Sequence, residues 1–312
     1  MKVIAVAGGT GHVGRTIVET LAQSPSFKVI VLGRKSSTGS PGEPAHVVVD
    51  YANVTAMATA LEQYNVHTVI SAIQVANEEA SAAEANLINA AAQSSSVKRF
   101  IMSGWGSLPN EMSPTSVFQK ASLEALRNTN LEWTRFAVGY FLDCYSLTSL
   151  KTHLPPLSFA IDVANKKAAI PGTGNEPIAF TYTYDVAKFV AAFLEEPKWD
   201  GLTFCYGEKT TWNEFVKVAE EVTGSSFDVT YDPLEKLQRG ETTELPAQKA
   251  ELALSPFPEA LTRQLLALLG IWSVTGQFDI PHEGSLNAKY QDIKPVTIRE
   301  ALQSRQGREG EA

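Results

Sequence analysis

Three glycines at intervals of three residues stand between an apolar run and an amphipathic stretch near the start of the chain. The run Lys2–Ala7 is typical of a buried β-strand, and Gly8, Gly11 and Gly14 follow it directly before a helical pattern. Glycine lets the backbone turn sharply and approach a pyrophosphate, whose charge then faces the N–H groups of a helix N-terminus. This order predicts a dinucleotide site, although a tight turn without a ligand is the simpler alternative. The residues expected to contact the dinucleotide in this turn are Gly8, Thr10, Gly11, His12, Val13 and Gly14.

A phosphate loop of the kind found in nucleotide triphosphatases is a rival interpretation of the same glycines. The letters from Gly9 to Thr16, GTGHVGRT, differ from the pattern GxxxxGK[ST] at one position, where Arg15 replaces the lysine. A planar guanidinium does not replace a compact ammonium between phosphates, and no acidic strand end is obviously placed for magnesium. We therefore favour the dinucleotide.

The basic pair Arg34 and Lys35 bears on which dinucleotide is bound. An NAD site usually has Asp or Glu about 20 residues after the last glycine, where it binds the ribose 2′-hydroxyl. That position is Arg34, and no acidic residue lies between Glu19 and Glu43. Because arginine can bind a phosphate through two parallel hydrogen bonds, the pair favours NADP(H). An ordinary solvated basic loop is the alternative.

The elements around these residues alternate between strands and helices over the first 136 positions. Near-continuous apolar runs such as VIAVA indicate strands buried on both faces, as in a parallel sheet. We therefore expect an α/β fold with a doubly wound, Rossmann-type parallel sheet. Strands are predicted at Lys2–Ala7, Lys28–Leu32, His46–Val49, Thr68–Ser71, Arg99–Met102 and Glu132–Phe136. Helices are predicted at Val13–Gln23, Val54–Tyr64, Ala80–Ser94 and Ser116–Asn128, and later at Asp185–Glu195 and Trp212–Thr223.

The alternation of strands and helices becomes less regular after Tyr145, where prolines and the turn PGTGN separate short segments. We expect a dinucleotide-binding domain at 1–145, to which later segments return, and a smaller C-terminal substrate-binding lobe at 146–303. The polar residues 304–312 are expected to be disordered.

Strand ends predict further cofactor contacts. In a doubly wound sheet the ligand lies across the carboxyl ends of the strands, at the switch point between the first and fourth strands. Ser71 ends the fourth predicted strand and Ala72 follows it, so both are expected at the cofactor. Asp50 closes HVVVD after the third strand and is a candidate for the adenine amino group, although aspartate is also common at strand ends for other reasons.

Composition and charge argue against several other classes. With 26 basic and 34 acidic residues the net charge is −8, and no Lys/Arg run suggests nucleic-acid or anionic-membrane binding. No apolar stretch reaches the length of a membrane span, and the N-terminus does not fit a signal peptide, so we expect a cytoplasmic protein. The histidines and the two cysteines lack metal-ligand spacing, and no GxSxG elbow occurs. A small-molecule substrate is the expected partner, and the oligomeric state stays open.

Several segments resemble one family. The glycine turn GGTGHVG, Arg34 after the second strand, KRFIMSGWG at Lys98–Gly106 and SVFQK at Ser116–Lys120 resemble the NmrA-like, isoflavone-reductase-like atypical short-chain dehydrogenases/reductases. Phe180–Pro197 and Gly207–Gly224 are similar to fungal members in particular. The resemblance covers roughly residues 1–235. Members include plant reductases of isoflavones, lignans and phenylcoumarans, fungal enzymes of secondary metabolism, and redox-sensing regulators that bind the dinucleotide without turnover.

The resemblance implies that Lys120 is catalytic. Ordinary short-chain dehydrogenases carry Tyr-x-x-x-Lys, but Ser116 occupies the tyrosine position here, on the same helix face as Lys120. The plant reductases likewise lack the tyrosine and use a helix lysine as general acid/base. Lys120 is therefore the candidate general acid/base and a cofactor contact, and an exposed lysine near a helix start is the alternative.

The resemblance also implies residues at the reacting centre, with two departures. Ser103 and Gly139 are expected at the cofactor, and the candidate substrate contacts are Trp105, Tyr140 and Phe141. Gly104 replaces a residue that is often acidic in relatives, and Val138 replaces a common asparagine. Both changes suggest a non-standard substrate or reaction.

The expected function is an NADPH-dependent reductase of an aromatic or polyketide-like small molecule in fungal secondary metabolism. A dinucleotide-sensing regulator without turnover is one alternative. A redox-neutral isomerase, cyclase or dehydratase on the same fold is another.

Overall fold

The computed structural model describes residues 1–35, 42–110, 116–145, 150–253 and 258–309, and the side chains up to residue 303. The chain divides into two compact units. Unit 1 comprises Met1–Trp105, Pro109–Ala137 and Val186–Phe204, and unit 2 comprises Gly106–Leu108, Val138–Asp185 and Cys205–Ala312.

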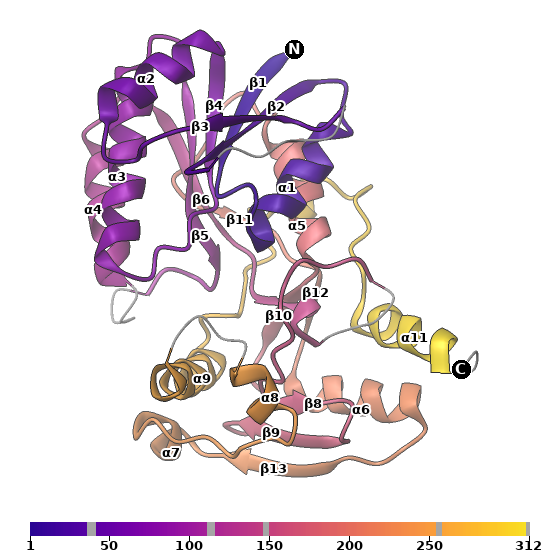
Figure 1. Ribbon diagram of the computed structural model, residues 1–312. Helices are drawn as coiled ribbons and strands as arrows, with labels where there is room; N and C mark the ends of the chain where they lie inside the picture. Colours follow the sequence, from indigo (N-terminus) through magenta and orange to yellow (C-terminus); the bar gives the residue numbers. More distant parts are fainter. Residues whose placement is uncertain (36–41, 111–115, 146–149, 254–257, 310–312) are drawn as a thin grey trace. The chain divides into compact units, whose positions relative to one another are not determined.

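Unit 1 is built on a seven-stranded parallel sheet (Figure 1). The strand order is β11-β6-β5-β4-β1-β2-β3, so the direction of winding reverses between β1 and β4. The fold class predicted from the sequence is thereby confirmed. The strands are β1 (Lys2–Ala7), β2 (Phe27–Gly33), β3 (Ala45–Val48), β4 (Val66–Ser71), β5 (Arg99–Gly106), β6 (Glu132–Ala137) and β11 (Thr203–Phe204).

Helices cover both faces of this sheet. Helices α2 (Val54–Gln63), α3 (Glu78–Gln93) and α4 (Ser116–Arg127) lie side by side along one face (Figure 1). The other face carries α1 (His12–Ala22) and α5 (Thr183–Phe193), which leads back into unit 1. Fully buried apolar side chains fill the layer between the sheet and α2–α4, among them Ile30, Val69, Phe100, Leu61 and Leu87.

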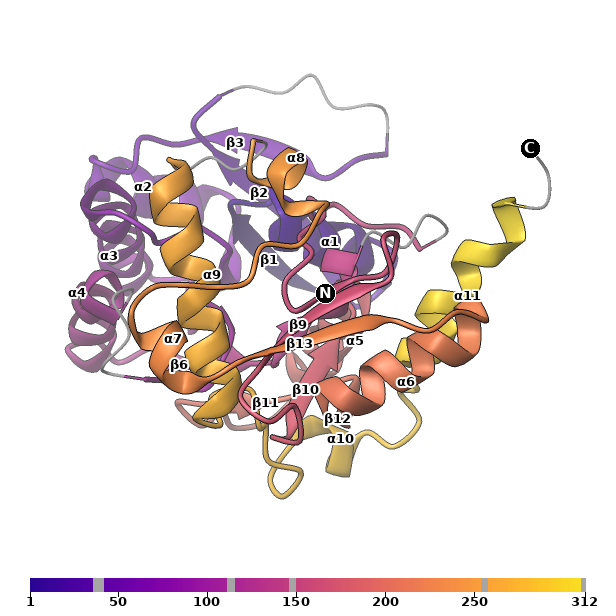
Figure 2. The ribbon, with the colours of Figure 1, turned by 90° about the horizontal axis from the view of Figure 1, so that it is seen from below.

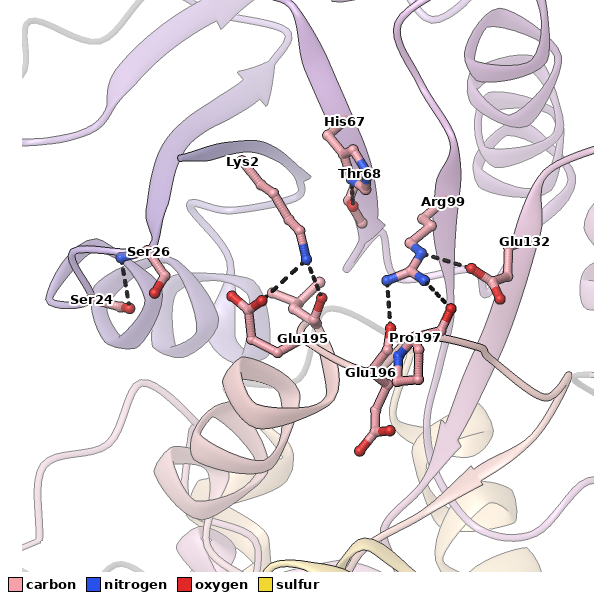
Figure 3. A network of polar contacts seen from close by, with 11 residues as sticks. Lys2, Ser24, Ser26, His67, Thr68, Arg99, Glu132, Glu195, Glu196 and Pro197 are labelled. Carbon is pink, nitrogen blue, oxygen red and sulfur yellow. Dashed lines mark hydrogen bonds and ion pairs between the residues drawn. The ribbon is translucent and has the colours of Figure 1, made fainter.

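The amino-terminal edge of the sheet is held by a buried guanidinium (Figure 3). Arg99, at the start of β5, donates from Nε to Glu132 Oε2 at 2.7 Å, across to the start of β6. Its other nitrogens donate to the carbonyl oxygens of Glu196 at 2.8 Å and Pro197 at 3.0 Å. The guanidinium also lies 4.8 Å from the ring centroid of Trp199. Arg99 thus fastens the segment between α5 and β11 to the sheet.

Unit 2 contains two small sheets, β12-β10-β7 and β13-β9-β8. Figure 2 shows β9 and β13 side by side, and their pairing is parallel. Its strands are β7 (Tyr140–Phe141), β8 (Ile161–Asp162), β9 (Lys167–Pro171), β10 (Ile178–Thr181), β12 (Glu208–Thr210) and β13 (Asp228–Asp232). Its helices, beside the 3₁₀ turn Leu142–Tyr145, are α6 (Trp212–Thr223), α7 (Leu234–Gln238), α8 (Gln248–Leu252), α9 (Glu259–Val274), α10 (Leu286–Lys289) and α11 (Ile298–Glu309).

The C-terminal segment differs from the prediction made for it. The sequence predicts disorder over 304–312, because the residues are polar and include glycine. Instead, α11 continues to Glu309, and residues 310–312 lie outside the described residues. Of the helices formed by described residues, none is long and apolar enough to cross a membrane.

Candidate functional site

The glycine turn after β1 packs against the end of β4. A Cβ on Gly14 would lie 2.2 Å from the carbonyl oxygen of Gly8, and a Cβ on Gly8 would lie 2.5 Å from that of Ala72. Gly8 also has a φ of +73°, which favours glycine. The turn is closed by the Gly11 N–H, which donates to the Gly8 carbonyl at 2.9 Å. Side chains at positions 8 and 14 would therefore not fit into this turn. We call the turn Gly8–Gly14 the glycine cradle.

Helix α1 begins at this turn without a side chain to cap it. Gly11 is the N-cap and has no side chain that could accept from the first N–H groups. The first turn of α1 contains no acidic residue, so nothing in it offsets the positive end of the helix dipole. His12, Val13 and Gly14 thus present backbone N–H groups beside the glycine cradle. Such a helix N-terminus suits a phosphate.

Arg34 and Lys35 follow the end of β2 and are both exposed. Arg34 Nη1 lies 3.6 Å from Glu79 Oε1 at the start of α3, and the two side chains are 78% and 85% exposed. An ion pair this open contributes little free energy, so Arg34 stays available to a stronger anion such as a phosphate. Ser36, which adjoins this pair, lies outside the described residues.

Asp50 and Tyr51 lie after β3. Asp50 is exposed, and its Oδ1 accepts from the Ala52 N–H at 2.9 Å, which shapes the turn that leads into α2. Tyr51 donates to the Leu32 carbonyl at 3.3 Å. Burial raises the pKa of Tyr51 to about 12, although the positive charge of Arg34 offsets part of this rise. Asp50 therefore has a local role that needs no ligand, and its proposed contact with adenine remains a prediction.

The ends of β4 and β5 are tied together beside the glycine cradle. Trp105 donates from Nε1 to the Ser71 carbonyl at 3.0 Å, and its ring stacks on Phe136 with centroids 5.3 Å apart. Ser103 donates from Oγ to the Ile73 carbonyl at 2.7 Å. The backbone N–H of Ala72 donates to the Ala7 carbonyl at 2.8 Å. These bonds fix the strand ends on both sides of the switch point, and Trp105 is held by packing on one face while staying partly exposed.

A buried carboxylate that was not predicted from the sequence lies below these strand ends. Glu84, in α3, is 0% exposed and accepts from the Ser103 N–H at 2.8 Å and the Ser122 hydroxyl at 2.7 Å. The Ser71 hydroxyl faces the same carboxylate outside strict hydrogen-bond geometry. Burial raises the pKa of Glu84, while these serines lower it. A signal was present, because Glu84 falls on the apolar stripe of α3 with Leu87, where a charged residue is unusual.

Helix α4 carries Lys120. Lys120 is exposed and lies one helical turn after Ser116, on the same face. Its neighbour Gln119 approaches the end of β5, with its amide nitrogen 4.0 Å from the position that a Cβ on Gly104 would occupy. Both α4 and the end of β5 thus belong to the same region of unit 1.

Three predicted site residues belong to unit 2 and have structural roles there. Gly139 has a φ of +80°, and a Cβ on it would lie 2.2 Å from the carbonyl oxygen of Ala179, so the close approach of β7 and β10 requires glycine. Phe141 is partly buried in β7. Tyr140 is 6% exposed and packs among aromatic rings of unit 2, including Phe180 and Trp212. The Tyr140 ring thus forms part of the core of unit 2, and its contact with substrate stays a prediction.

A second buried carboxylate organises unit 2. Asp143 accepts from the Thr183 N–H at 2.8 Å, from the Thr183 hydroxyl at 2.6 Å and from the Thr152 hydroxyl at 2.9 Å. Burial raises the pKa of Asp143, while these bonds lower it. Asp143 thus satisfies the first N–H of α5. Asp185 lies in the first turn of this helix and accepts from the Val296 N–H at 2.7 Å.

The sequence model of the NmrA-like family matches residues 1–289. The chain belongs to the NmrA-like family. It is 34% identical over 230 residues to the oxidoreductase BOA1 of Botryotinia fuckeliana, a match that covers 72% of this chain and 77% of that protein. It is 31% identical over 279 residues to the oxidoreductase swnN of Metarhizium robertsii, which covers 80% of this chain and 82% of the relative.

Solved structures share the fold of this NmrA-like chain. A leucoanthocyanidin reductase–NADPH complex from Vitis vinifera superposes with a TM-score of 0.72 at 16% identity, over 96% of this chain and 98% of the other. The protein AtPrR2 with NADP+ and (+)-pinoresinol superposes with a TM-score of 0.71 at 20% identity, over 97% and 98% of the two chains. Within the described part of this NmrA-like chain, no three His, Cys, Asp or Glu side chains are grouped to bind a metal.

Proposed function

We propose that this NmrA-like protein is an NADP(H)-dependent oxidoreductase that reduces an aromatic or polyketide-like small molecule. The observation that carries the proposal is the glycine cradle, in which Gly8 and Gly14 leave no room for a Cβ and the uncapped N-terminus of α1 stands beside them. The fungal relatives named as oxidoreductases support the reaction class. The NADPH and NADP+ complexes of proteins with the same fold support the cofactor.

The cofactor would be held by residues of unit 1. The cradle and the N–H groups of α1 bind the pyrophosphate, and Arg34 with Lys35 binds the 2′-phosphate. Asp50 accepts from the adenine amino group, and Ser71, Ala72 and Ser103 line the strand ends. Gly139 is a further proposed cofactor contact. When bound, the dinucleotide supplies a hydride.

Lys120 acts as general acid in this proposal. Reduction of an electron-poor carbon leaves negative charge on the substrate, and a positioned ammonium group can donate the proton that neutralises it. Trp105 and Phe141 are the proposed contacts of the substrate. An aromatic or polyketide-like substrate from fungal secondary metabolism suits these rings.

A redox-neutral reaction on the same fold is the second candidate. Gly104 brings no side chain to the end of β5, where a Cβ would have ordinary contacts at 3.6 Å from Arg135. Val138 is fully buried and brings no polar group. These two departures from the pattern of the relatives are what favours the redox-neutral candidate.

Binding and turnover together test the proposal. NADPH and NADH are titrated by fluorescence, and the purified protein is then incubated with a panel of enones and aromatic ketones. NADPH absorbance and product mass are both followed. Consumption of NADPH with a product two mass units heavier supports the reductase. Product formation without cofactor supports the redox-neutral candidate, and tight NADPH binding without any product supports a dinucleotide-sensing regulator.

A further inference from the structure

Helix α4 is connected to α3 by two side-chain hydrogen bonds that flank Lys120. Ser81 of α3 donates from Oγ to the Phe118 carbonyl at 2.6 Å, two residues before Lys120. Ser122, two residues after it, donates from Oγ to Glu84 Oε2 at 2.7 Å. Apolar contacts are non-directional, so they permit a helix to slide or turn against its neighbour. Hydrogen bonds require a narrow range of distance and angle, so these two bonds fix the rotation and height of α4.

Glu84 extends this connection to the sheet. The pairing of β4 with β5 ends at Ile70 and Ile101, and two residues later the Ser103 N–H donates to Glu84 Oε1 at 2.8 Å. One carboxylate therefore bonds α4 with one oxygen and the end of β5 with the other. Ser122 and Glu84 are both 0% exposed, so water does not compete for either bond.

We propose that Glu84 is a positioning residue, which sets the helix that carries Lys120 against the strand end that carries Ser103. This rests on the proposed function, because it gives Glu84 the task of holding the general acid in place. Glu84 itself touches neither cofactor nor substrate, since its whole carboxylate is buried among its partners. A small displacement of a catalytic group lowers turnover far more than it lowers binding. Removal of the bond to α4 should accordingly lower kcat and leave NADPH binding almost unchanged.

Three variants separate positioning from a general loss of stability. Ser122→Ala deletes the bond to α4 and leaves the bond to Ser103. Glu84→Gln keeps both, because its amide oxygen can accept from the Ser103 N–H while its nitrogen donates to the Ser122 hydroxyl. Thr134→Val is the matched control, since it breaks an equally buried hydroxyl pair at 2.8 Å, between Thr134 and Thr203 on β6 and β11.

Turnover is the first readout. We expect kcat to fall about 10-fold in Ser122→Ala, with the Kd of NADPH within about twofold of wild type. Glu84→Gln and Thr134→Val should keep kcat. In the Lys120→Ala background, Ser122→Ala should have no further effect on turnover, because the group that it positions is gone. An equal loss of kcat in Thr134→Val, or a full additional loss in the double variant, would overturn the proposal.

Hydrogen exchange of the free protein is the second readout and needs no turnover. The amides of α4 should exchange faster in Ser122→Ala than in wild type, and at the wild-type rate in Thr134→Val. Unchanged exchange in α4 would contradict the positioning role of Glu84 and would leave the proposed role of Lys120 untouched. Full activity of Lys120→Ala is a different result, which contradicts the proposed role of Lys120 and removes the positioning role with it.

Discussion

Arg99 and Glu132 are joined at 2.7 Å across neighbouring strands, and the same guanidinium holds the segment that brings the chain back to unit 1. The Arg99 side chain is only 11% exposed, so its bonds face little competition from water. Residues 186–204 therefore rejoin the sheet through a specific polar contact at the amino-terminal edge, as well as through the pairing of β11 with β6.

Loss of this guanidinium should destabilise unit 1. Arg99→Ala should lower the free energy of unfolding by about 3 kcal/mol, because buried partners lose a charged donor. The control is Lys2→Ala, which removes another cation of this edge. Lys2 binds Glu195 at 3.2 Å (Figure 3). The two side chains are 34% and 53% exposed. Its loss should cost less than about 1 kcal/mol. Urea unfolding followed by circular dichroism measures both, and equal effects would contradict the role given to burial.

Many of the strands and helices could be predicted from the sequence because their signals are local. The strand Lys2–Ala7 and the helix Trp212–Thr223 have the same bounds in the sequence prediction and in the structure. The other early strands and helices differ at their ends by a few residues. Continuous β-branched runs and amphipathic periods encode these elements within a dozen residues, and the glycine turn between them is equally local.

Contacts between distant segments could not be predicted in the same way. The hydrogen bond of Thr183 to Asp143 joins residues 40 positions apart, and no pattern in either segment names the other. The resemblance implies a substrate contact for Tyr140, and no local pattern shows that the tertiary packing of unit 2 buries its ring. Glu84 could have been noticed as a charge on an apolar stripe, yet its serine partners come from three other segments.

Cofactor preference should depend on Arg34. Arg34→Ala should weaken NADPH binding at least 10-fold, or about 1.4 kcal/mol, because a bidentate partner of the 2′-phosphate is lost. NADH binding should change little, since NADH has a hydroxyl at this position. Fluorescence titration of both dinucleotides measures the two constants. Equal affinities of the wild type for NADPH and NADH, unchanged by the substitution, would refute the 2′-phosphate argument.

Two glycines of the turn, Gly11 and Gly14, should differ in their tolerance of a methyl group. A Cβ at Gly14 would lie 2.2 Å from a backbone oxygen, whereas at Gly11 the nearest atom is 3.3 Å away. Gly14→Ala should therefore abolish measurable NADPH binding, and Gly11→Ala should weaken it by less than about 10-fold. Thermal unfolding of each variant serves as control. Comparable NADPH affinities for the two alanine variants would show that the cradle does not set cofactor binding.

Burial of Glu84 should make stability depend on pH. Its pKa in the folded protein is raised above the ordinary value of 4.5, so the folded state binds this proton more tightly than the unfolded state does. The contribution of this carboxyl to the free energy of unfolding therefore falls as pH rises above 4.5, by up to about 1.4 kcal/mol per pH unit. Glu84→Gln lacks the titration, so its stability relative to wild type should increase between about pH 4 and pH 7. Urea unfolding across this range measures the difference, and a constant difference would contradict the raised pKa.

Lys120 should separate proton transfer from cofactor binding. Lys120→Ala should lower kcat about 100-fold, the usual contribution of a positioned proton-transfer group. The Kd of NADPH should change far less, because the phosphates are held by the glycine cradle and the basic pair. The fold should survive, since Lys120 is exposed and alanine is the better helix former.

The matched control is Lys98→Ala, which removes another exposed lysine of unit 1 outside the proposed site. Steady-state kinetics with NADPH and an accepted substrate, beside a fluorescence titration, measure the two effects. Wild-type kcat in Lys120→Ala would show that this lysine is an ordinary surface residue, and the search for the general acid would move to the other side chains of α4.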